Sequence, residues 1–287
     1  MAEEKVEPTY VGENENLVFI VPKELFTMKL TSDEKLDRET AKKFSNYLTG
    51  TFKGFQKANK TKYNNKNNSK TEVSANFWID FQNQAKEKGI DLIGFTPVLK
   101  NFIFKGLPVV GKNAIILGME MDWNSIKTAP SILCGIEAFR IYYELGEVTI
   151  ELTEYLQNQG YKAEAHHPFG GKLLFTAHAV AAGLGYKGRN GLIITPEFGP
   201  RQRWSMITTD ADIPPKLEKD FTEMIDFCEN CGLCIENCLG KATFDDPVEK
   251  VVGSGVITHI DRRKCIESLL NNNYCSNCLK VCPQGRK

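Results

Sequence analysis

Apolar residues recur at helical spacing in four stretches of the chain. An apolar side chain at every third or fourth position forms one helix face, which can pack against a core. Thr31 and Glu34 fit a capping box at the start of the first stretch. Gly89, Gly160 and Gly183 mark the ends of the other three, as is usual where a helix stops. The predicted helices span residues 31–48, 77–89, 136–159 and 172–182.

Shorter apolar runs between these helices predict strands. DLIGF (91–95) and NAIILGMEM (113–121) fit buried strands. LIIT (192–195) and RWSMITT (203–209) are predicted to pair as a hairpin around PEFGPRQ. Strands that alternate with helices indicate an α/β body.

A proline pair separates this body from a segment rich in cysteine. Pro214 and Pro215 interrupt both helix and strand patterns, so we place a domain boundary there. The sequence therefore predicts three parts: an N-terminal extension (1–72), the α/β body (73–213) and a cysteine-rich domain (214–287).

The composition of residues 51–70 favours a loop. This segment carries six lysines, five asparagines and no acid, so it offers little apolar surface to bury. A basic patch for an acidic partner is the other interpretation. Over the whole chain, Lys plus Arg and Asp plus Glu number 36 each, so no overall charge argues for a nucleic-acid partner.

Eight of the nine cysteines form two quartets of related spacing. The first quartet reads C-x2-C-x2-C-x3-C, and the second reads C-x9-C-x2-C-x3-C followed by Pro283. A cubane [4Fe–4S] cluster needs one thiolate at each of its four irons, and in two-cluster ferredoxins the fourth comes from the other motif. The spacing thus predicts two [4Fe–4S] clusters with crossed ligation. The first would be held by Cys228, Cys231, Cys234 and Cys282, and the second by Cys265, Cys275, Cys278 and Cys238.

Two structural zinc sites are the alternative for these quartets. Zinc sites usually combine two C-x2-C pairs across a longer insert, and three cysteines within seven residues fit that arrangement poorly. The ninth cysteine, Cys134, lies in a mixed apolar stretch and is expected to be a small buried side chain rather than a ligand.

A glycine-rich stretch follows the last predicted helix. Glycines at such a position let the backbone approach a ligand and leave amides for a phosphate or another polar group. Arg189 and Asn190 could add hydrogen bonds. A helix stop is the simpler explanation, since the dinucleotide fingerprint needs strand-then-helix order, which is reversed here. The glycines are Gly183, Gly185, Gly188 and Gly191.

The glycine stretch and the cysteines together resemble the superfamily of reductive dehalogenases and epoxyqueuosine reductases. The text AAGLGYKGRNGLIITPEFGPRQRWSMITTD (181–210) is similar to the family's helix end, strand, Gly-Pro-Arg turn and closing strand. The lone Cys265 before the last three cysteines and the KGIDLIGFTP segment (88–97) also resemble the family. The resemblance covers roughly residues 75–287.

This resemblance implies a nitroreductase-like α/β (α+β) sandwich followed by a ferredoxin-like domain with two [4Fe–4S] clusters. It also implies a bound cobamide, a cobalamin-type corrinoid, which the clusters would reduce to Co(I) for chemistry on a small-molecule substrate. The glycine stretch with Arg189 and Asn190 would contribute to binding it. An electron donor protein of the ferredoxin or flavodoxin type would supply the electrons.

The catalytic acid of the epoxyqueuosine branch has no counterpart in this chain. The matching position falls on Phe169, and the Asp-Tyr-His triplet of that branch reads Ile141, Tyr142, Tyr143. Tyrosines of this kind are otherwise core residues with a satisfied hydroxyl, and the histidine pair could simply lie in a loop. His178 is expected to be structural. The candidate proton donors are Tyr142, Tyr143, His166 and His167.

We therefore expect a cytoplasmic iron–sulfur oxidoreductase of the reductive dehalogenase type. The start, MAEEKVEPTY, is acidic and polar rather than signal-like, and no apolar run is long enough for a membrane helix. One alternative is a tRNA epoxyqueuosine reductase, which would need a basic surface for tRNA. The other is a non-catalytic electron carrier or corrinoid-binding protein.

Overall fold

A computed structural model describes residues 6–15, 17–18, 36–65, 70–249 and 257–286 of the 287-residue chain. Its centre is a four-stranded antiparallel sheet in the order β2-β4-β8-β5. The strands are β2 (Leu92–Pro97), β4 (Asn113–Glu120), β5 (Ala163–His166) and β8 (Gln202–Thr209).

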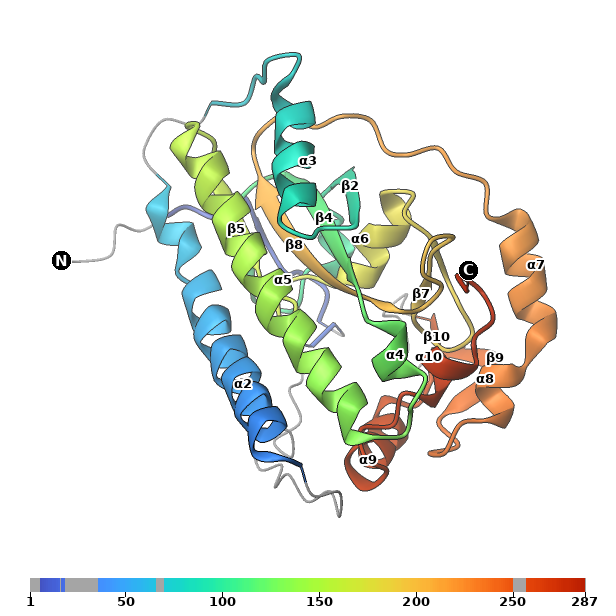
Figure 1. The fold of residues 1–287 in the computed structure, drawn as a ribbon. Coiled ribbons are helices and arrows are strands. Elements are labelled where there is room, and N and C mark those ends of the chain that lie inside the picture. Colours follow the sequence, from blue (N-terminus) through green and yellow to red (C-terminus); the bar gives the residue numbers. More distant parts are fainter. Residues whose placement is uncertain (1–5, 16, 19–35, 66–69, 250–256, 287) are drawn as a thin grey trace.

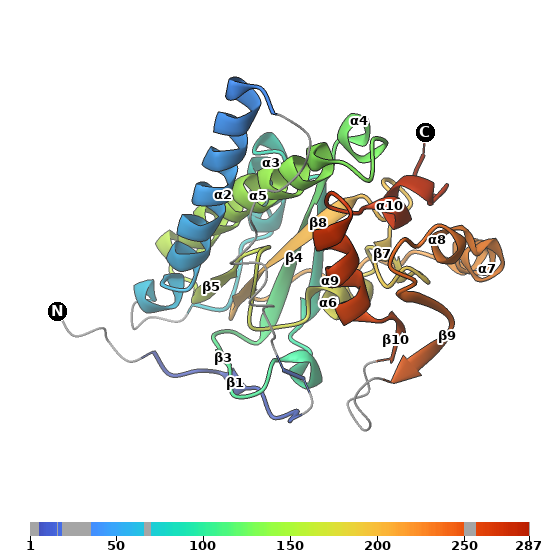
Figure 2. The same ribbon diagram turned by 90° about the horizontal axis from the view of Figure 1, so that it is seen from below.

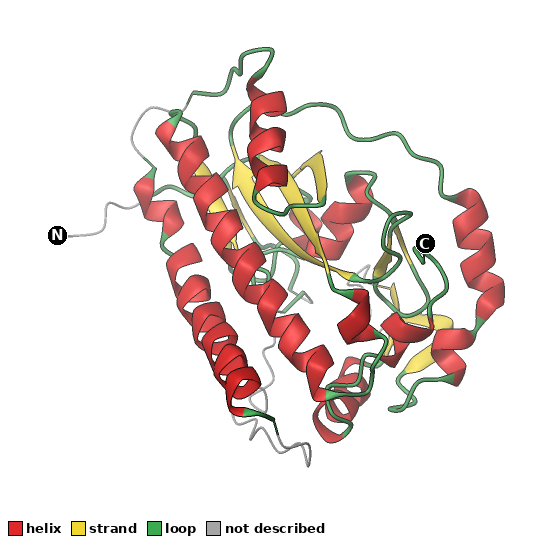
Figure 3. Cartoon of the chain, in the orientation of Figure 1, coloured by secondary structure: helices red, strands yellow, loops and turns green. Residues whose placement is uncertain are grey.

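Both faces of this sheet are buried. Strand β4 shows this, because successive side chains of a strand point to opposite faces and those of β4 enter two different cores. Ile115 and Leu117 belong to a core under α3 (Phe77–Glu87) and α5 (Ile132–Asn158). Ala114 and Ile116 belong to a second core under α6 (Phe175–Ala181). Figure 2 shows α5 and α6 on opposite sides of β4 and β8. The body is thus a mixed α/β sandwich. Figure 3 shows its helices in red and its strands in yellow.

The long helix α2 (Arg38–Ala58) lies beside α5 on the outside of this sandwich. Its N-cap is Asp37, whose carboxylate accepts hydrogen bonds from the amides of Glu39 and Thr40. The predicted cap at Thr31 and Glu34 lies outside the described residues. The predicted loop over 51–70 is wrong where α2 continues to Ala58. The lysines of this part of the helix lie on its exposed side, while its other side is made of small residues. Of these, Thr51, Gly54 and Ala58 are buried.

Helices α2 and α5 approach closely where glycines leave room for His167. A Cβ on Gly146 would lie 2.1 Å from Nε2 of His167, and one on Gly54 would lie 3.0 Å from the same atom. The imidazole is buried between the two helices. The glycines are therefore required by packing rather than by backbone conformation.

We expect Gly146→Ala to destabilise the protein by about 1–3 kcal/mol, because the new methyl group overpacks the imidazole. The melting temperature should fall by roughly 2–4 °C for each kcal/mol, which circular dichroism can follow. In a His167→Ala background the same substitution should cost much less. An equal cost in both backgrounds would contradict the steric explanation.

Strand pairing around the glycine stretch differs from the prediction. β7 (Ile193–Ile194) pairs with β6 (Tyr186–Lys187), whereas β8 joins the central sheet between β4 and β5. The predicted hairpin of residues 192–195 with 203–209 is therefore wrong. A tight turn between Gly188 and Gly191 closes the shorter hairpin, since the Gly191 amide donates to the Gly188 carbonyl at 2.9 Å.

Short elements complete the body. The remaining bounds are β1 (Tyr10–Val11), β3 (Pro108–Val109), α4 (Trp123–Ile126) and two 3-10 turns, η1 (Thr61–Asn64) and η2 (Lys100–Phe102). Strands β1 and β3 pair antiparallel. No helix in the described part of the chain is both long and apolar enough to cross a membrane.

The cysteine-rich segment packs beside the body at the ends of β4 and α5. It contains α7 (Thr222–Cys231), α8 (Leu233–Glu236), an antiparallel hairpin of β9 (Thr243–Glu249) and β10 (Ile257–Ile260), α9 (Arg262–Asn271) and α10 (Asn277–Val281). Lys280 donates to the Ala129 carbonyl at 2.6 Å, and the ring of Tyr274 lies against Gly135 of α5. Figures 1 and 2 show α9 and α10 toward the body, with α7 and α8 at the outer edge.

Candidate functional site

Four of the motif cysteines line one small pocket. Cys228 and Cys231 come from α7, Cys234 from α8 and Cys282 from the residue after α10. The cavity volume of this pocket is about 20 Å³. The pKa of Cys234 is raised to about 11, first by burial and then by the neighbouring Cys228 and Cys282. We call these four cysteines the outer group.

The other four cysteines influence one another in the same way. Burial raises the pKa of Cys278, and the neighbouring Cys265 and Cys275 raise it further, with a contribution from Cys238. Burial tends to raise the pKa of Cys238, but hydrogen bonds from the Ala242 and Thr243 amides outweigh it. We call Cys238, Cys265, Cys275 and Cys278 the inner group.

The two groups of four cysteines match the number of thiolates that two cubane clusters require. Each cubane needs four thiolates, one at each iron, and each group mixes ligands from both sequence motifs. The two groups are also neighbours, because Cys234 of the outer group contributes to the raised pKa of Cys278. Within the described residues, no set of three or more His, Cys, Asp or Glu side chains could hold a single metal ion.

The glycine stretch lies next to the outer group, but its glycines contact the chain itself. A Cβ on Gly183 would lie 2.1 Å from the Leu217 carbonyl oxygen, and one on Gly185 would lie 2.3 Å from that of Ile194. A Cβ on Gly191 would lie 2.9 Å from the Ile260 side chain. Close packing thus explains these three glycines without a ligand.

The polar residues of this stretch have partners as well. Arg189 forms an ion pair with Asp245 at 3.2 Å. Asn190 is buried, accepts a hydrogen bond from the Leu192 amide at 3.1 Å and lines the pocket of the outer group. The side-chain amide of Asn190 is therefore one polar group that the stretch presents toward the cysteines, close to Gly188.

The two candidate histidines are buried and neutral. His166, the last residue of β5, lies 3.0 Å from the Thr208 hydroxyl, and burial lowers its pKa well below the usual value. Burial lowers the pKa of His167 to about 3. Its Nδ1 accepts from the Phe169 amide at 3.1 Å, while Nε2 has no hydrogen-bond partner among the described residues. Because the lowered pKa values keep both rings in the neutral form at neutral pH, neither histidine is an imidazolium that could act as the general acid.

His178 and Cys134 have the structural roles predicted for them. His178 Nδ1 lies 2.9 Å from the Leu174 carbonyl oxygen, and its Nε2 accepts from the Leu99 amide at 3.0 Å. Cys134 is buried, and its thiol donates to the Ser125 carbonyl at 3.3 Å. Neither side chain lies in the cysteine groups.

The depressed pKa values of His167 and His178 predict a loss of stability in acid. Burial lowers the pKa of His178 to about 4, while an unfolded histidine titrates near 6.5. Between these values only the unfolded chain takes up protons. The free energy of unfolding should therefore fall from pH 6.5 downward, by about 1.4 kcal/mol per pH unit for each histidine. Urea unfolding at pH 7 and 5 measures this, and His167→Gln should remove one histidine's share. An unchanged slope would contradict the assignment.

The two candidate tyrosines face different surroundings. Tyr143 lies against Gly50 and Tyr47 of α2, and it lines a surface pocket of about 610 Å³ beside α5. Tyr142 instead contacts Phe139 and Phe169, with ring centres 5.8 and 5.5 Å away. The structure therefore gives Tyr142 and Tyr143 different surroundings, a difference that the sequence did not reveal.

Tyr142 belongs to an aromatic cluster that reaches from α2 to the cysteine-rich segment. Its rings contact one another in pairs between 5.2 and 6.3 Å apart. Most of them are only half-buried, so part of their apolar surface is exposed. Its members are Phe44, Phe52, Phe55, Phe139, Tyr142, Phe169 and Tyr274.

Arg203 connects this aromatic cluster to the inner group. Its guanidinium lies 5.1 Å from the centre of the Tyr142 ring. Burial and the neighbouring Cys238 and Cys275 raise the pKa of the Cys265 thiol, and the positive charges of Arg262 and Arg203 partly oppose that rise. The Nε of Arg203 is buried without a hydrogen-bond partner in the described part of the protein. Sequence reasoning missed Arg203 and Phe169. The available signal for Arg203 was a charged side chain inside a predicted strand.

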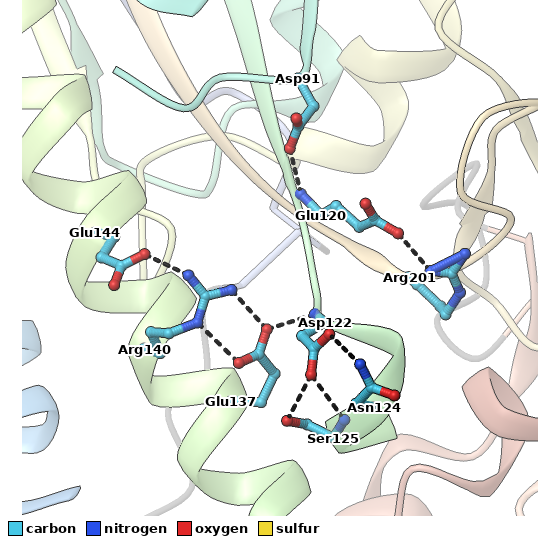
Figure 4. A network of polar contacts seen from close by, with 9 residues as sticks. All are labelled: Asp91, Glu120, Asp122, Asn124, Ser125, Glu137, Arg140, Glu144 and Arg201. Carbon is cyan, nitrogen blue, oxygen red and sulfur yellow. Dashed lines mark hydrogen bonds and ion pairs between the residues drawn. The ribbon is translucent and has the colours of Figure 1, made fainter. Parts of the chain in front are cut away.

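A polar network links the end of β4 to α5 and to Arg201 (Figure 4). Arg140 is bound by Glu137 and Glu144 of its own helix, and a Glu137 carboxylate oxygen accepts from the Asp122 amide at 2.6 Å. Arg201 pairs with Glu120 at 2.7 Å and donates to the Gly285 carbonyl at 2.7 Å. These contacts fix the cysteine-rich segment on the body.

Known proteins resemble the chain in sequence. The tetrachloroethene reductive dehalogenase of Desulfitobacterium hafniense is 32% identical over 183 residues, which cover 60% of this chain and 32% of that protein. The epoxyqueuosine reductase of Staphylococcus aureus is 30% identical over 132 residues, which cover 40% of this chain and 30% of that protein. The chain is homologous to the reductive dehalogenases and the epoxyqueuosine reductases. No protein-family model matches it.

This reductive dehalogenase homologue also shares the family's fold. A solved reductive dehalogenase, described as suggesting a mechanism for B12-dependent dehalogenation, superposes with a TM-score of 0.73 at 19% identity. The superposition covers 99% of this chain and 44% of that one. The matched sequence spans about a third of the length of the curated relatives. The sequence resemblance is thereby confirmed, together with a mixed α/β body followed by a cysteine-rich segment.

Proposed function

We propose that the protein is an iron–sulfur oxidoreductase of the reductive dehalogenase type. In this proposal two [4Fe–4S] clusters, one on each cysteine group, pass electrons to a cobamide that serves reduction of a small substrate. The body would be nitroreductase-like and the cysteine-rich segment ferredoxin-like. The observation that carries the proposal is the arrangement of eight cysteines in two neighbouring groups of four, with Arg203 linking the inner group to Tyr142.

The residues near the inner group fit a large, flat ligand with polar edges. The half-buried rings of the aromatic cluster offer apolar contact, and the unpaired Nε of Arg203 offers a charged donor. A bound cobamide supplies a cobalt centre for two-electron reduction. Asn190 lies on the outer side of the cysteines, so we place the glycine stretch beside the clusters rather than beside the ligand.

The chain's own groups have separate tasks in this proposal. The aromatic cluster orients an apolar substrate and excludes water from it. Arg203 stabilises negative charge that develops as a halide leaves. Of the candidate donors, we assign the proton to the Tyr142 hydroxyl, because the Tyr142 ring lies in the aromatic cluster and 5.1 Å from the Arg203 guanidinium.

Metal analysis after anaerobic reconstitution with iron, sulfide and cobalamin tests the proposal. We expect about eight irons per chain, which is two cubanes, together with one cobalt retained on gel filtration. With a chemical reductant, the loaded protein should release chloride from tetrachloroethene, the substrate named for its relatives. Zinc without iron would refute the proposal. Iron without cobalt would favour the electron carrier instead.

Homology to the epoxyqueuosine reductases favours one alternative function. That function needs a tRNA-facing basic surface, and exposed Lys53, Lys57 and Lys60 at the end of α2 provide a small one. The position of that family's acid holds Phe169, whose ring packs in the aromatic cluster. Conversion of epoxyqueuosine in tRNA by the loaded protein, without chloride release, would establish this alternative.

A further inference from the structure

Exposed apolar side chains lie on α7 and α8, the helices that carry three cysteines of the outer group, and just after α8. Phe227 is 50% exposed, Leu233 37% and Leu239 45%, although all three are large hydrophobic residues. Phe227 and Leu233 also line the pocket that contains the outer-group cysteines. Apolar residues gathered at the surface over a redox centre are typical of a contact with another protein.

The same surface is acidic. Residues 221–240 contain four carboxylates and no lysine or arginine, and all four carboxylates are exposed. Three of them recur every third residue along α7, so they follow one side of that helix. The whole chain has equal numbers of acidic and basic residues, so this charge is a local feature. The four are Glu223, Asp226, Glu229 and Glu236, and with Phe227, Leu233 and Leu239 they form what we call the acidic face.

The acidic face lies at the far end of the electron path from the aromatic cluster. The outer group opens to it through Phe227 and Leu233, whereas the inner group contacts the body, with Tyr274 beside Cys275 packed on Phe44. In Figures 1 and 2, α7 and α8 are at the edge of the molecule away from α2. A redox partner that contacts this face comes close to the outer group first.

We infer that the acidic face docks an electron donor protein whose own contact surface is basic. The inference rests on the proposed function, since it needs clusters on the two groups. In each encounter the donor is oxidised by one electron and the outer cluster is reduced by one, with no bond or proton transferred. Opposite charges steer such an encounter and repel acidic carriers. Among electron donors of the ferredoxin or flavodoxin type, we therefore expect one whose contact surface is basic.

Binding of a small basic c-type cytochrome to the reconstituted protein tests the docking surface directly. With both proteins oxidised no electron moves, so calorimetry measures association alone. We expect binding at low salt that weakens as salt screens the charges. The triple variant Asp226→Lys, Glu229→Lys, Glu236→Lys should weaken it about tenfold or more. The matched control Glu72→Lys, Asp80→Lys, Glu87→Lys changes the net charge equally near α3 and should bind as the unmodified protein does.

Electron transfer provides the second readout. After chemical reduction and removal of the reductant, the protein should reduce the ferric cytochrome rapidly, each cluster losing one electron to one haem iron. The acidic-face triple variant should be slower by a similar factor, while a small reductant should reduce its clusters at the usual rate. Equal binding and equal rates in the two triple variants would overturn the inference. Absence of iron would instead overturn the proposed function. Even then, the binding measurement would still show whether the acidic face docks a basic protein.

Discussion

Cys282→Ala is expected to remove the cluster of the outer group, although Cys282 belongs to the second sequence motif. Cys282 shares a pocket with Cys228, Cys231 and Cys234 and contributes to the raised pKa of Cys234. A cubane with three thiolates loses its fourth anchor, so the iron content should fall from about eight to about four per chain. Iron analysis and electron paramagnetic resonance of the reduced protein measure this loss.

Cys238→Ala is the reciprocal test, because Cys238 belongs to the first motif and to the inner group. It should remove the inner cluster and leave the outer one, with the same loss of iron and the opposite change in the spectrum. Cys275→Ala is the matched control, since both assignments place Cys275 with the inner group. If Cys238→Ala matched Cys228→Ala in its spectrum instead, ligation within each motif would be correct and the crossed assignment wrong.

The grouping of the cysteines was accessible from sequence because a cluster imposes a local chemical requirement. Four thiolates must meet each cubane, and a compact motif supplies three of them, so the spacing already indicates a ligand from the other motif. Cys282 shares a pocket with Cys228, Cys231 and Cys234, as that reasoning expects, and the crossed ligation itself stays a prediction. The helices and strands of the body followed from periodicity for a similar reason, as each buries one face.

Features that depend on distant residues were not accessible in this way. Whether Tyr142 or Tyr143 faces the aromatic cluster depends on how α5 is rotated against α2, and both residues belong to a half-apolar pattern. Arg203 acquires its neighbours only when β8 joins the central sheet, where the sequence had suggested a local hairpin. The end of α2 was missed because averaged composition conceals a stripe of small residues. Gly54 is buried there by contact with a helix some ninety residues away in sequence.

The close packing of the glycine stretch changes what its residues imply. Gly183 and Gly185 meet carbonyl oxygens of Leu217 and Ile194, so a side chain would clash whether or not a cofactor were present. The stretch also brings Tyr186 beside the outer group. Burial, and after it the neighbouring Cys228, raises the pKa of Tyr186, and the Tyr186 hydroxyl donates to the Met224 carbonyl at 2.9 Å. The stretch thus forms part of the junction between the body and the cysteine-rich segment.

Tyr142→Phe is expected to reduce the turnover of tetrachloroethene by about 10²–10⁴-fold, the usual contribution of a positioned proton donor. The substitution keeps the ring contacts with Phe139 and Phe169 and removes only the hydroxyl. Substrate affinity and cobalt content should therefore change little. Chloride release under saturating substrate, with cobalt and iron measured on the same sample, separates loss of the donor from loss of a cofactor.

Tyr143→Phe is the matched control, since it removes the same atom one residue away. Tyr143 lies against Gly50 on the α2 side of α5 and lines the surface pocket, so its turnover should stay within a few-fold of the unmodified protein. Arg203→Gln should lower turnover in the Tyr142 protein and have little further effect in Tyr142→Phe, because the two side chains are in contact and act on one step. If Tyr143→Phe abolished turnover and Tyr142→Phe did not, the reacting centre would lie at the surface pocket beside α5 rather than at the aromatic cluster.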